Sequence, residues 1–234
     1  MDTYRVDFGR PIALFVLPTV GLVPHLSQGF HIYEERYRQM VESSIAAGGG
    51  NLDRSLPIAV AVAGRGDSSD VGGIRPVVCV GRLSETDRFP DGRFNIMTHG
   101  VCRARIDEIV PPEGERLFPQ AWLRPLEIGE PDFAMPEVRS TLRSLLHGPR
   151  LSRLRCGELV RRLASLDDVP VSAMLDLVGY WAFEDVDLRY DLLAQPDSRE
   201  RAAMVTRELQ ALDRLVSMVD RQHPAAWPKG ISWN

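Results

Sequence analysis

The sequence predicts an α+β protein in which a small β-barrel or pseudo-barrel is followed by a helical bundle. Up to about residue 130, short apolar runs of strand length are separated by Gly and Pro, with a single early helix, a pattern typical of small barrels. Beyond that point the apolar residues recur at spacings of three and four, which indicates amphipathic helices. We therefore expect a barrel domain over residues 1–128 and a helical domain over residues 129–234, joined by a Pro-containing linker at 129–136.

The apolar runs of the first half place its strands and its helix. Strands are expected at residues 12–17, 22–26, 30–33, 58–63, 77–83 and 118–126. Between the third and fourth of these runs the apolar residues follow helical spacing over residues 37–45, and Gly48 ends the helix.

The clearest local signal is a hairpin centred on Pro90, Asp91 and Gly92. Pro90 has a fixed φ, Asp91 offers a side-chain hydrogen-bond acceptor and Gly92 can adopt a positive φ. This combination is typical of tight turns. The flanking segments 82–88 and 93–99 should therefore pair as antiparallel strands. Alternation then divides the outgoing strand between two faces, with Phe94, Ile96 and Thr98 on one and Asn95, Met97 and His99 on the other.

Alternation continues after Gly100 and assigns two faces to the next segment. Cys102, Ala104 and Ile106 suit a core face. Arg103 and Arg105 suit solvent or a groove.

The second half reads as a series of helices. They are expected at residues 138–146, 159–166, 170–178, 187–193 and 198–219. The last of them carries an unbroken apolar seam from Ala202 to Val219, which would form either bundle core or a dimer contact. A homodimer is therefore one of the open alternatives.

Composition narrows the class of protein. The 234 residues are 44% hydrophobic and 26% charged, with a formal net charge of -4, as in ordinary globular proteins. Nucleic acid is not an expected partner, because proteins that bind nucleic acid usually carry a basic face.

The sequence also bears on location. No run of apolar residues is long enough for a membrane span and the N-terminus lacks a signal-peptide pattern, so we expect no membrane association and a cytoplasmic location. Cys79, Cys102 and Cys156 lack disulfide or metal spacing.

Long ordered motifs resemble a known family. Residues 14–24 (LFVLPTVGLVP) are similar to that family's opening FPLPNVVLFPG, and residues 30–41 (FHIYEERYRQMV) to its LHIFEPRYRQMV. Residues 90–96 and 100–106 are similar to its PDGRYNI and GVGRFRI. The family is that of the Lon protease amino-terminal, substrate-binding domain, and the resemblance covers most of residues 10–220. His25 departs from the family's motif, which has glycine at that position.

The resemblance implies a PUA-like β pseudo-barrel followed by a helical bundle. In the full-length Lon protease this region helps to bind substrates and to assemble the oligomer. The ATPase and the Ser–Lys protease of Lon are not expected in this chain. Lys229 is the only lysine, and it lies outside any Walker A pattern, which requires a lysine for the phosphates. We therefore expect a non-enzymatic protein with no cofactor and no bound metal.

Eight residues are candidates for contacting a protein or ligand: Phe30, Tyr33, Glu34, Arg36, Arg82, Phe94, His99 and Arg103. All of them except His99 have a structural alternative. Glu34 and Arg36 could instead cap the first helix and pair with each other. Four arginines of the hairpin and the next strand could instead lie on a solvated sheet face, in ion pairs with Glu85, Asp87 and Asp91: Arg82, Arg93, Arg103 and Arg105. Most of the aromatic rings should belong to the core, and only exposed, clustered rings would mark a binding patch.

Our hypothesis is a protein- or peptide-binding module that recognises unfolded or extended segments through apolar surface and an exposed strand edge. An adaptor role in protein quality control would fit it. Two alternatives remain open. A PUA-like RNA-binding module would bind with a steep salt dependence. A small-ligand-binding domain or hydrolase would hold His31 or His99 beside a carboxylate in a closed pocket.

Overall fold

The computed structural model describes residues 5–66, 68, 70–126, 135–153 and 157–221. The chain divides into two compact units, here called the barrel unit (Met1–Glu130 and Asp185–Asp197) and the helical unit (Pro131–Glu184 and Ser198–Asn234). Each unit is described by itself. Most of the expected linker, Cys156 and Lys229 lie outside the described residues.

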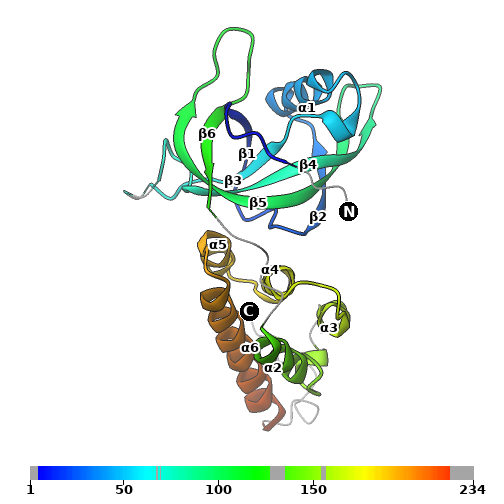
Figure 1. The fold of residues 1–234 in the computed structure, drawn as a ribbon, viewed down its shortest axis with the longest axis vertical. Coiled ribbons are helices and arrows are strands. Elements are labelled where there is room, and N and C mark those ends of the chain that lie inside the picture. Colours follow the sequence, from blue (N-terminus) through cyan, green and yellow to red (C-terminus); the bar gives the residue numbers. More distant parts are fainter. Residues whose placement is uncertain (1–4, 67, 69, 127–134, 154–156, 222–234) are drawn as a thin grey trace, which may run out of the picture. The chain divides into compact units, whose positions relative to one another are not determined.

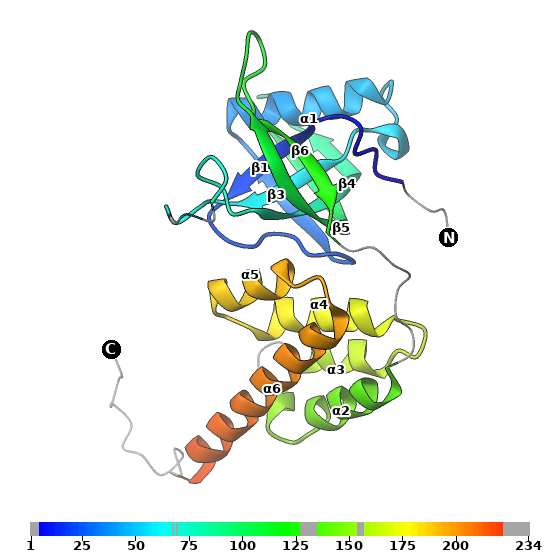
Figure 2. The same ribbon diagram turned by 60° about the vertical axis from the view of Figure 1, so that its left-hand side comes forward.

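The barrel unit is a closed sheet with one strand added outside the closure (Figures 1 and 2). Its strands are β1 (Ile12–Leu17), β2 (Ser27–Ile32), β3 (Ile58–Val62), β4 (Val77–Arg88), β5 (Phe94–Val110) and β6 (Gln120–Pro125). They follow the order β2-β5-β4-β3-β1-β6, and a further pairing of β5 with β6 closes the ring. β1 and β3 run parallel, and the other pairs are antiparallel.

Small and β-branched side chains fill the barrel. Its interior cluster is Ile12, Leu14, Ala59, Ala61, Ile74, Val78, Val80, Ala104, Ile106, Ala121 and Leu123. The alternation expected for Ala104 and Ile106 is confirmed by their burial. This mixed α+β architecture agrees with the fold class expected from the sequence.

Residues 22–26 form a turn and not the expected strand. Leu22, Val23 and Leu26 are buried, so their apolar character reflects burial and not pairing. The segment crosses the sheet at Gly100, where an added Cβ would lie 2.1 Å from the Val23 carbonyl oxygen. His25 adopts a φ of 67° in this turn. That backbone region favours glycine, the residue of the family motif.

Helix α1 (Glu35–Ala47) lies across one end of the barrel (Figures 1 and 2). Its buried face includes Tyr37, whose hydroxyl donates to the Val16 carbonyl at 3.2 Å and accepts from the Val16 N–H at 3.3 Å. Burial raises the pKa of Tyr37 above its ordinary value, against the opposing effect of Arg36. The ring also meets Phe15 edge-on at 4.8 Å between centroids. Helix α1 is therefore fixed to β1 by both packing and hydrogen bonds.

Helix α5 (Val186–Ala194) belongs to the barrel unit, although its position in the sequence assigns it to the helical half. The Tyr190 hydroxyl accepts from the Val77 N–H at 2.8 Å, and the Arg75 guanidinium stacks on the Tyr190 ring at 3.4 Å. Arg75 also pairs with Asp187 at 3.1 Å.

Arg103 is covered by this helix. Its side chain is 1% exposed and donates from Nε to the Leu193 carbonyl at 2.9 Å. The expectation that Arg103 faces solvent or a groove is therefore wrong. Alternation placed it correctly outside the barrel interior, but a helix distant in the sequence packs over it.

The helical unit comprises α2 (Pro136–Leu146), α3 (Gly157–Ser165), α4 (Val171–Ala182) and α6 (Ser198–Arg221) among the described residues. In α6 the first half of the predicted seam is bundle core, since Ala202, Val205 and Leu209 are buried. The second half is more open, with Val219 43% exposed. A homodimer through this helix remains a prediction.

A buried ion pair crosses the same bundle. Arg201 Nε lies 3.4 Å from Asp176 Oδ1, and the two side chains are 2% and 1% exposed. None of the helices in the described part of the chain is long and apolar enough to span a membrane.

Candidate functional site

The candidate site is the outer face of the sheet formed by β2, the first part of β5 and the last part of β4. The hairpin expected from the sequence builds it: Phe89 N–H donates to the Arg93 carbonyl at 2.9 Å, and Gly92 has a φ of 84°. The inner face is buried at Phe94, Ile96 and Thr98, which confirms the predicted alternation.

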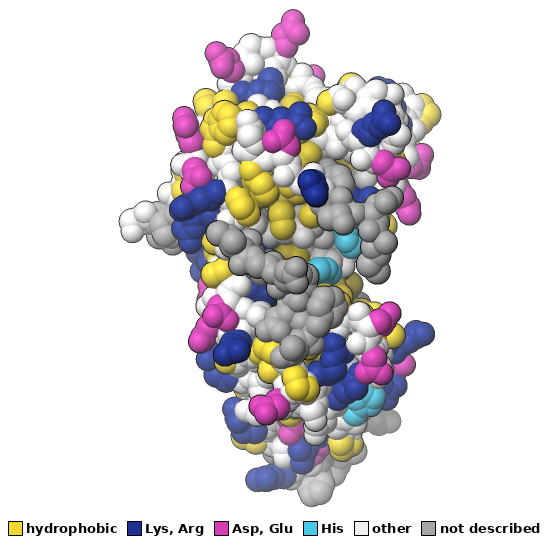
Figure 3. All heavy atoms as spheres, viewed as in Figure 1, with side chains coloured by type: hydrophobic (Ala, Val, Ile, Leu, Met, Phe, Trp, Pro, Cys, Tyr) yellow, Lys and Arg dark blue, Asp and Glu magenta, His cyan; other side chains and the backbone are white. Residues whose placement is uncertain are grey.

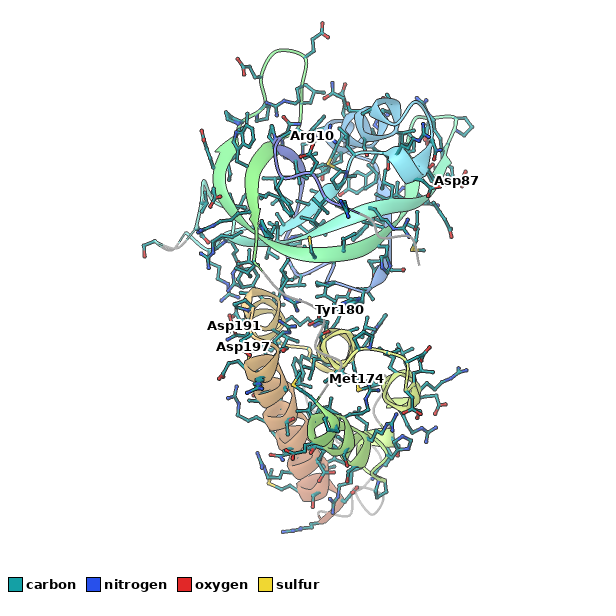
Figure 4. All side chains as sticks on the ribbon, in the orientation of Figure 1. Arg10, Asp87, Met174, Tyr180, Asp191 and Asp197 are labelled. Atoms are coloured by element: carbon teal, nitrogen blue, oxygen red, sulfur yellow. The ribbon has the colours of Figure 1, made fainter. Side chains whose placement is uncertain are left out.

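Three cross-strand rows make up the outer face. The first row is Ser27, His99 and Arg82; the second is Gly29, Met97 and Glu85; the third is His31, Asn95 and Asp87. We call this set the row surface. Its charge changes along the strands, because the first row ends in Arg82, whereas the second and third rows end in the carboxylates of Glu85 and Asp87. Asp87 projects from the hairpin end of the sheet (Figure 4).

A shallow depression lies over the second and third rows. It encloses about 350 Å³ and is lined by Gly29, His31, Glu85, Asp87 and Met97, among others. Gly29 has no side chain and so leaves the space above Met97 empty. A Cβ built on Gly29 would occupy that space, 3.7 Å from Met97 Cε, which is an ordinary van der Waals distance. The depression can therefore accept a small apolar side chain above Met97.

The hairpin is held against α1, which fixes the row surface. Arg88 Nη2 donates to Glu42 Oε1 at 2.7 Å, and Arg38 Nη1 donates to the Asp91 carbonyl at 3.2 Å. At the tip, Arg93 pairs with Asp91 at 2.7 Å. Hydrogen bonds from the Arg93 backbone and side chain hold the pKa of Asp91 below its ordinary value.

Rings gather at the end of β2. His31 Nδ1 lies 2.8 Å from Asn95 Oδ1, and its ring lies 6.4 Å from Tyr33 and 6.0 Å from Phe89 between centroids. Tyr33 is 65% exposed. An exposed tyrosine beside a second ring is the kind of group that anchors a protein partner.

The other end of the row surface is cationic. Ser27 Oγ lies 3.0 Å from His99 Nδ1, and Arg82 occupies the same row. Burial, together with the positive charges of Arg82 and His25, lowers the pKa of His99. In a Ser–His–Asp triad a carboxylate stabilises the imidazolium. The cations around His99 have the opposite effect, so this pair is a poor general base.

Strand β2 presents an open edge. It pairs with β5 alone among the described residues. Gly100 N–H donates to the Leu26 carbonyl at 2.8 Å. Antiparallel alternation therefore turns the backbone groups of Ser27, Gly29 and His31 toward the open edge. The Gln28 side chain donates to one of them, the Gly29 carbonyl, at 3.1 Å.

The structure distributes the predicted site residues widely. Arg82 and His99 lie on the row surface, and Tyr33 lies beside it. Phe30 is half-buried on the opposite face, edge-on to Phe15 at 5.2 Å, and Phe94 is 3% exposed. These two rings pack in the fold, as does Arg103.

Glu34 and Arg36 pair with each other at 2.7 Å, as their structural alternative predicted. The Glu34 side chain does not cap α1; its backbone carbonyl accepts from Tyr37 and Arg38 instead.

Sequence reasoning did not select Gly29, Met97, Glu85 or Asp87 as binding residues, and it named His31 only for the small-ligand alternative. The alternation of side chains had placed Met97 on the same face as His99, and this could have identified Met97 as a candidate binding residue. The pairing register that sets Gly29 beside Met97 was not readable from the sequence. The ion pairs expected for the arginines are confirmed at Arg93.

No group of three or more His, Cys, Asp or Glu within the described ranges is placed to hold a metal ion. On the face shown in Figure 3, arginine and acidic side chains are interspersed, without one continuous basic surface.

Comparison with known proteins agrees with the fold. A search of curated proteins gave no match. The structure is similar to the crystal structure of a Lon N-terminal domain protein from Xanthomonas campestris, with 17% identity and a TM-score of 0.60 over 84% of this chain and 96% of that one. It is also similar to the N-terminal domain of the Mycobacterium avium complex Lon protease, with 16% identity and a TM-score of 0.60 over 88% and 98% of the two chains. The family model of the ATP-dependent protease La (LON) substrate-binding domain matches residues 11–211. The chain therefore belongs to the family of the LON substrate-binding domain.

Proposed function

We propose that this protein binds extended segments of unfolded protein along the open edge of β2, with alternate side chains of the segment lying over the row surface. The observation that carries the proposal is the edge itself. Ser27, Gly29 and His31 turn their backbone groups outward beside a depression of about 350 Å³. Strand addition obtains its affinity from backbone hydrogen bonds and its selectivity from pockets for alternate side chains.

The surroundings of the edge favour a segment without fixed structure. Backbone pairing recognises no particular sequence, and the depression beside Gly29 admits many small apolar side chains. Unfolded chains expose both their backbone groups and their apolar side chains, whereas folded proteins hide them. An adaptor role in protein quality control would follow from such binding.

The test measures binding of a fluorescein-labelled octapeptide of alternating valine and threonine by anisotropy. The wild-type protein should bind it with micromolar affinity. Gly29→Val should weaken binding at least tenfold, because the added side chain fills the depression. Gly9→Val is the matched control, since it adds the same side chain at an exposed bend outside the sheet, and it should bind as the wild type does.

Peptide chemistry tests the strand pairing separately. N-methylation at alternate residues removes the N–H groups of one side of an extended peptide. Of the two peptides methylated in opposite phases, one should lose binding and the other should keep it. Equal binding of both would rule out pairing along an edge. Binding that required RNA instead, with a steep salt dependence, would favour the alternative of a nucleic-acid module.

A further inference from the structure

The second half of α6 has an apolar stripe on its outer side. Leu215 and Met218 are 53% and 54% exposed, and Ala211 precedes them at helical spacing. Side chains three and four residues apart are neighbours on a helix, so these three form one line. They line a shallow groove of about 560 Å³ along α6. We call them the α6 stripe.

A row of arginines runs beside the α6 stripe. Arg207, Arg214 and Arg221 are exposed and lie seven residues apart, close to two helical turns, so they share one line along the helix. Each of them is three or four residues from a member of the stripe, which makes the two lines adjacent. We call these three residues the arginine row.

The arginine row has little acidic compensation. Arg207 bonds only to Glu208, its neighbour in the chain, with 3.2 Å between Arg207 Nε and Glu208 Oε1. Arg214 and Arg221 take part in no ion pair within the part of the chain that the structure describes. The row therefore presents positive charge beside an exposed apolar surface.

The acidic residues of this half of α6 hold its other side. Asp213 pairs with Arg150 at 2.9 Å, and Asp220 pairs with Arg153 at 2.8 Å. Asp213 lies one turn from Leu209, which is fully buried in the bundle, so these pairs belong to the inner side. They fix the helix within the helical unit and leave its outer side open to a partner.

A second copy of this chain fits the outer side poorly. When two helices related by a twofold axis run antiparallel, each flank faces the same flank of the other helix, so the arginine row would face itself. In a parallel pair the row would face the other flank. The one carboxylate that this flank offers along the second half of α6 is Glu208, which is already bonded to Arg207. Charge therefore disfavours a homodimer through this surface.

We propose that the α6 stripe and the arginine row together bind an acidic amphipathic helix of a partner protein. Apolar residues of the partner at spacings of three and four lie against the stripe, as in other helix pairs. Its glutamates or aspartates, seven residues apart on one flank, pair with the arginine row, because the guanidinium group is suited to carboxylates. This surface is separate from the edge of β2 and does not rest on the proposed function.

The experiment uses synthetic helical peptides of four heptads with a leucine seam. One peptide carries glutamate along one flank of the seam, and the second carries glutamine there. In calorimetric titrations at low ionic strength, the wild-type protein should bind the glutamate peptide with micromolar affinity. It should bind the glutamine peptide about tenfold more weakly, because several exposed ion pairs, each weak, are lost together. Added salt should reduce this ratio.

Substitutions locate the binding surface. Arg214→Glu should abolish the preference for glutamate and should bind a third peptide, with lysine on the flank, more tightly than the wild-type protein does. Arg162→Glu is the control, since it makes the same charge change at an exposed position of α3. Leu215→Asp should abolish binding of every peptide, whereas Leu159→Asp, at a side chain of α3 that is 42% exposed, should not.

Several outcomes would overturn the proposal. Equal affinity of the wild-type protein for the glutamate and glutamine peptides, or no binding of either, would do so without any variant. Sedimentation velocity should show a monomer, and a dimer that Leu215→Asp dissociates would assign the surface to a second copy. Binding to phosphatidylserine vesicles that Arg214→Glu abolishes, with no peptide binding, would assign it to a membrane. The valine–threonine octapeptide should bind Leu215→Asp as it binds the wild type, so the two proposals fail separately.

Discussion

Replacing Tyr190 by phenylalanine tests whether α5 is an integral part of the barrel unit. The Tyr190 hydroxyl accepts from the Val77 N–H at 2.8 Å, and the two residues are 4% and 1% exposed. Phenylalanine keeps the ring on which Arg75 stacks at 3.4 Å, so only the hydrogen bond is lost. A buried N–H left without an acceptor costs about 1–3 kcal/mol.

The assay is urea unfolding followed by circular dichroism. With a slope of about 2 kcal/mol per molar urea, the unfolding midpoint of Tyr190→Phe should fall by about 0.5–1.5 M. Tyr33→Phe is the control, since it removes the same hydroxyl from a side chain that is 65% exposed, and its free energy of unfolding should change by no more than about 0.5 kcal/mol. If Tyr190→Phe unfolds at the same urea concentration as the wild type, α5 does not stabilise the barrel through this bond.

Three further predictions concern stability. His25→Gly should raise the free energy of unfolding by about 0.5–1 kcal/mol, because glycine adopts the φ of 67° without the steric cost of a Cβ; a lower thermal midpoint would contradict this. Arg201→Met should cost about 3–5 kcal/mol by leaving Asp176 buried without its partner, and adding Asp176→Leu should restore most of that in chemical denaturation. Asp185→Ala should lower the thermal midpoint at pH 7, since Asp185 caps α5. Hydrogen bonds from the backbone of Leu188 and Asp187 hold the pKa of Asp185 below its ordinary value, so the difference from wild type should disappear as the pH falls through that lowered pKa. A difference that persists in acid would refute the cap.

Local signals in the sequence predicted much of the barrel. The turn at Pro90–Gly92 fixed the hairpin, because its residues demand particular backbone angles. The strand expected at residues 22–26 was wrong, because apolar residues report burial and do not distinguish a paired strand from a buried crossing segment. The placement of α5 was hidden because helical periodicity says nothing about which sheet a helix covers.

The candidate site was predictable only in part. Alternation placed His99 on an outer face, and exposure of Tyr33 follows from its position after β2. The depression depends on Gly29 lying beside Met97, which is a matter of register between strands far apart in the sequence. For Arg103 the sequence predicted the correct face of the strand but not its burial, because helix α5, which is distant in the sequence, covers that face.

Amide hydrogen exchange at β2 measures the proposed edge pairing most directly. Reduced, carboxymethylated lactalbumin serves as a permanently unfolded partner, and exchange is followed residue by residue by NMR. The outward N–H groups of Ser27, Gly29 and His31 should become protected on binding, while those of Gln28 and Phe30, which face β5, should change little. Binding without protection of the three outward groups would contradict strand addition at this edge.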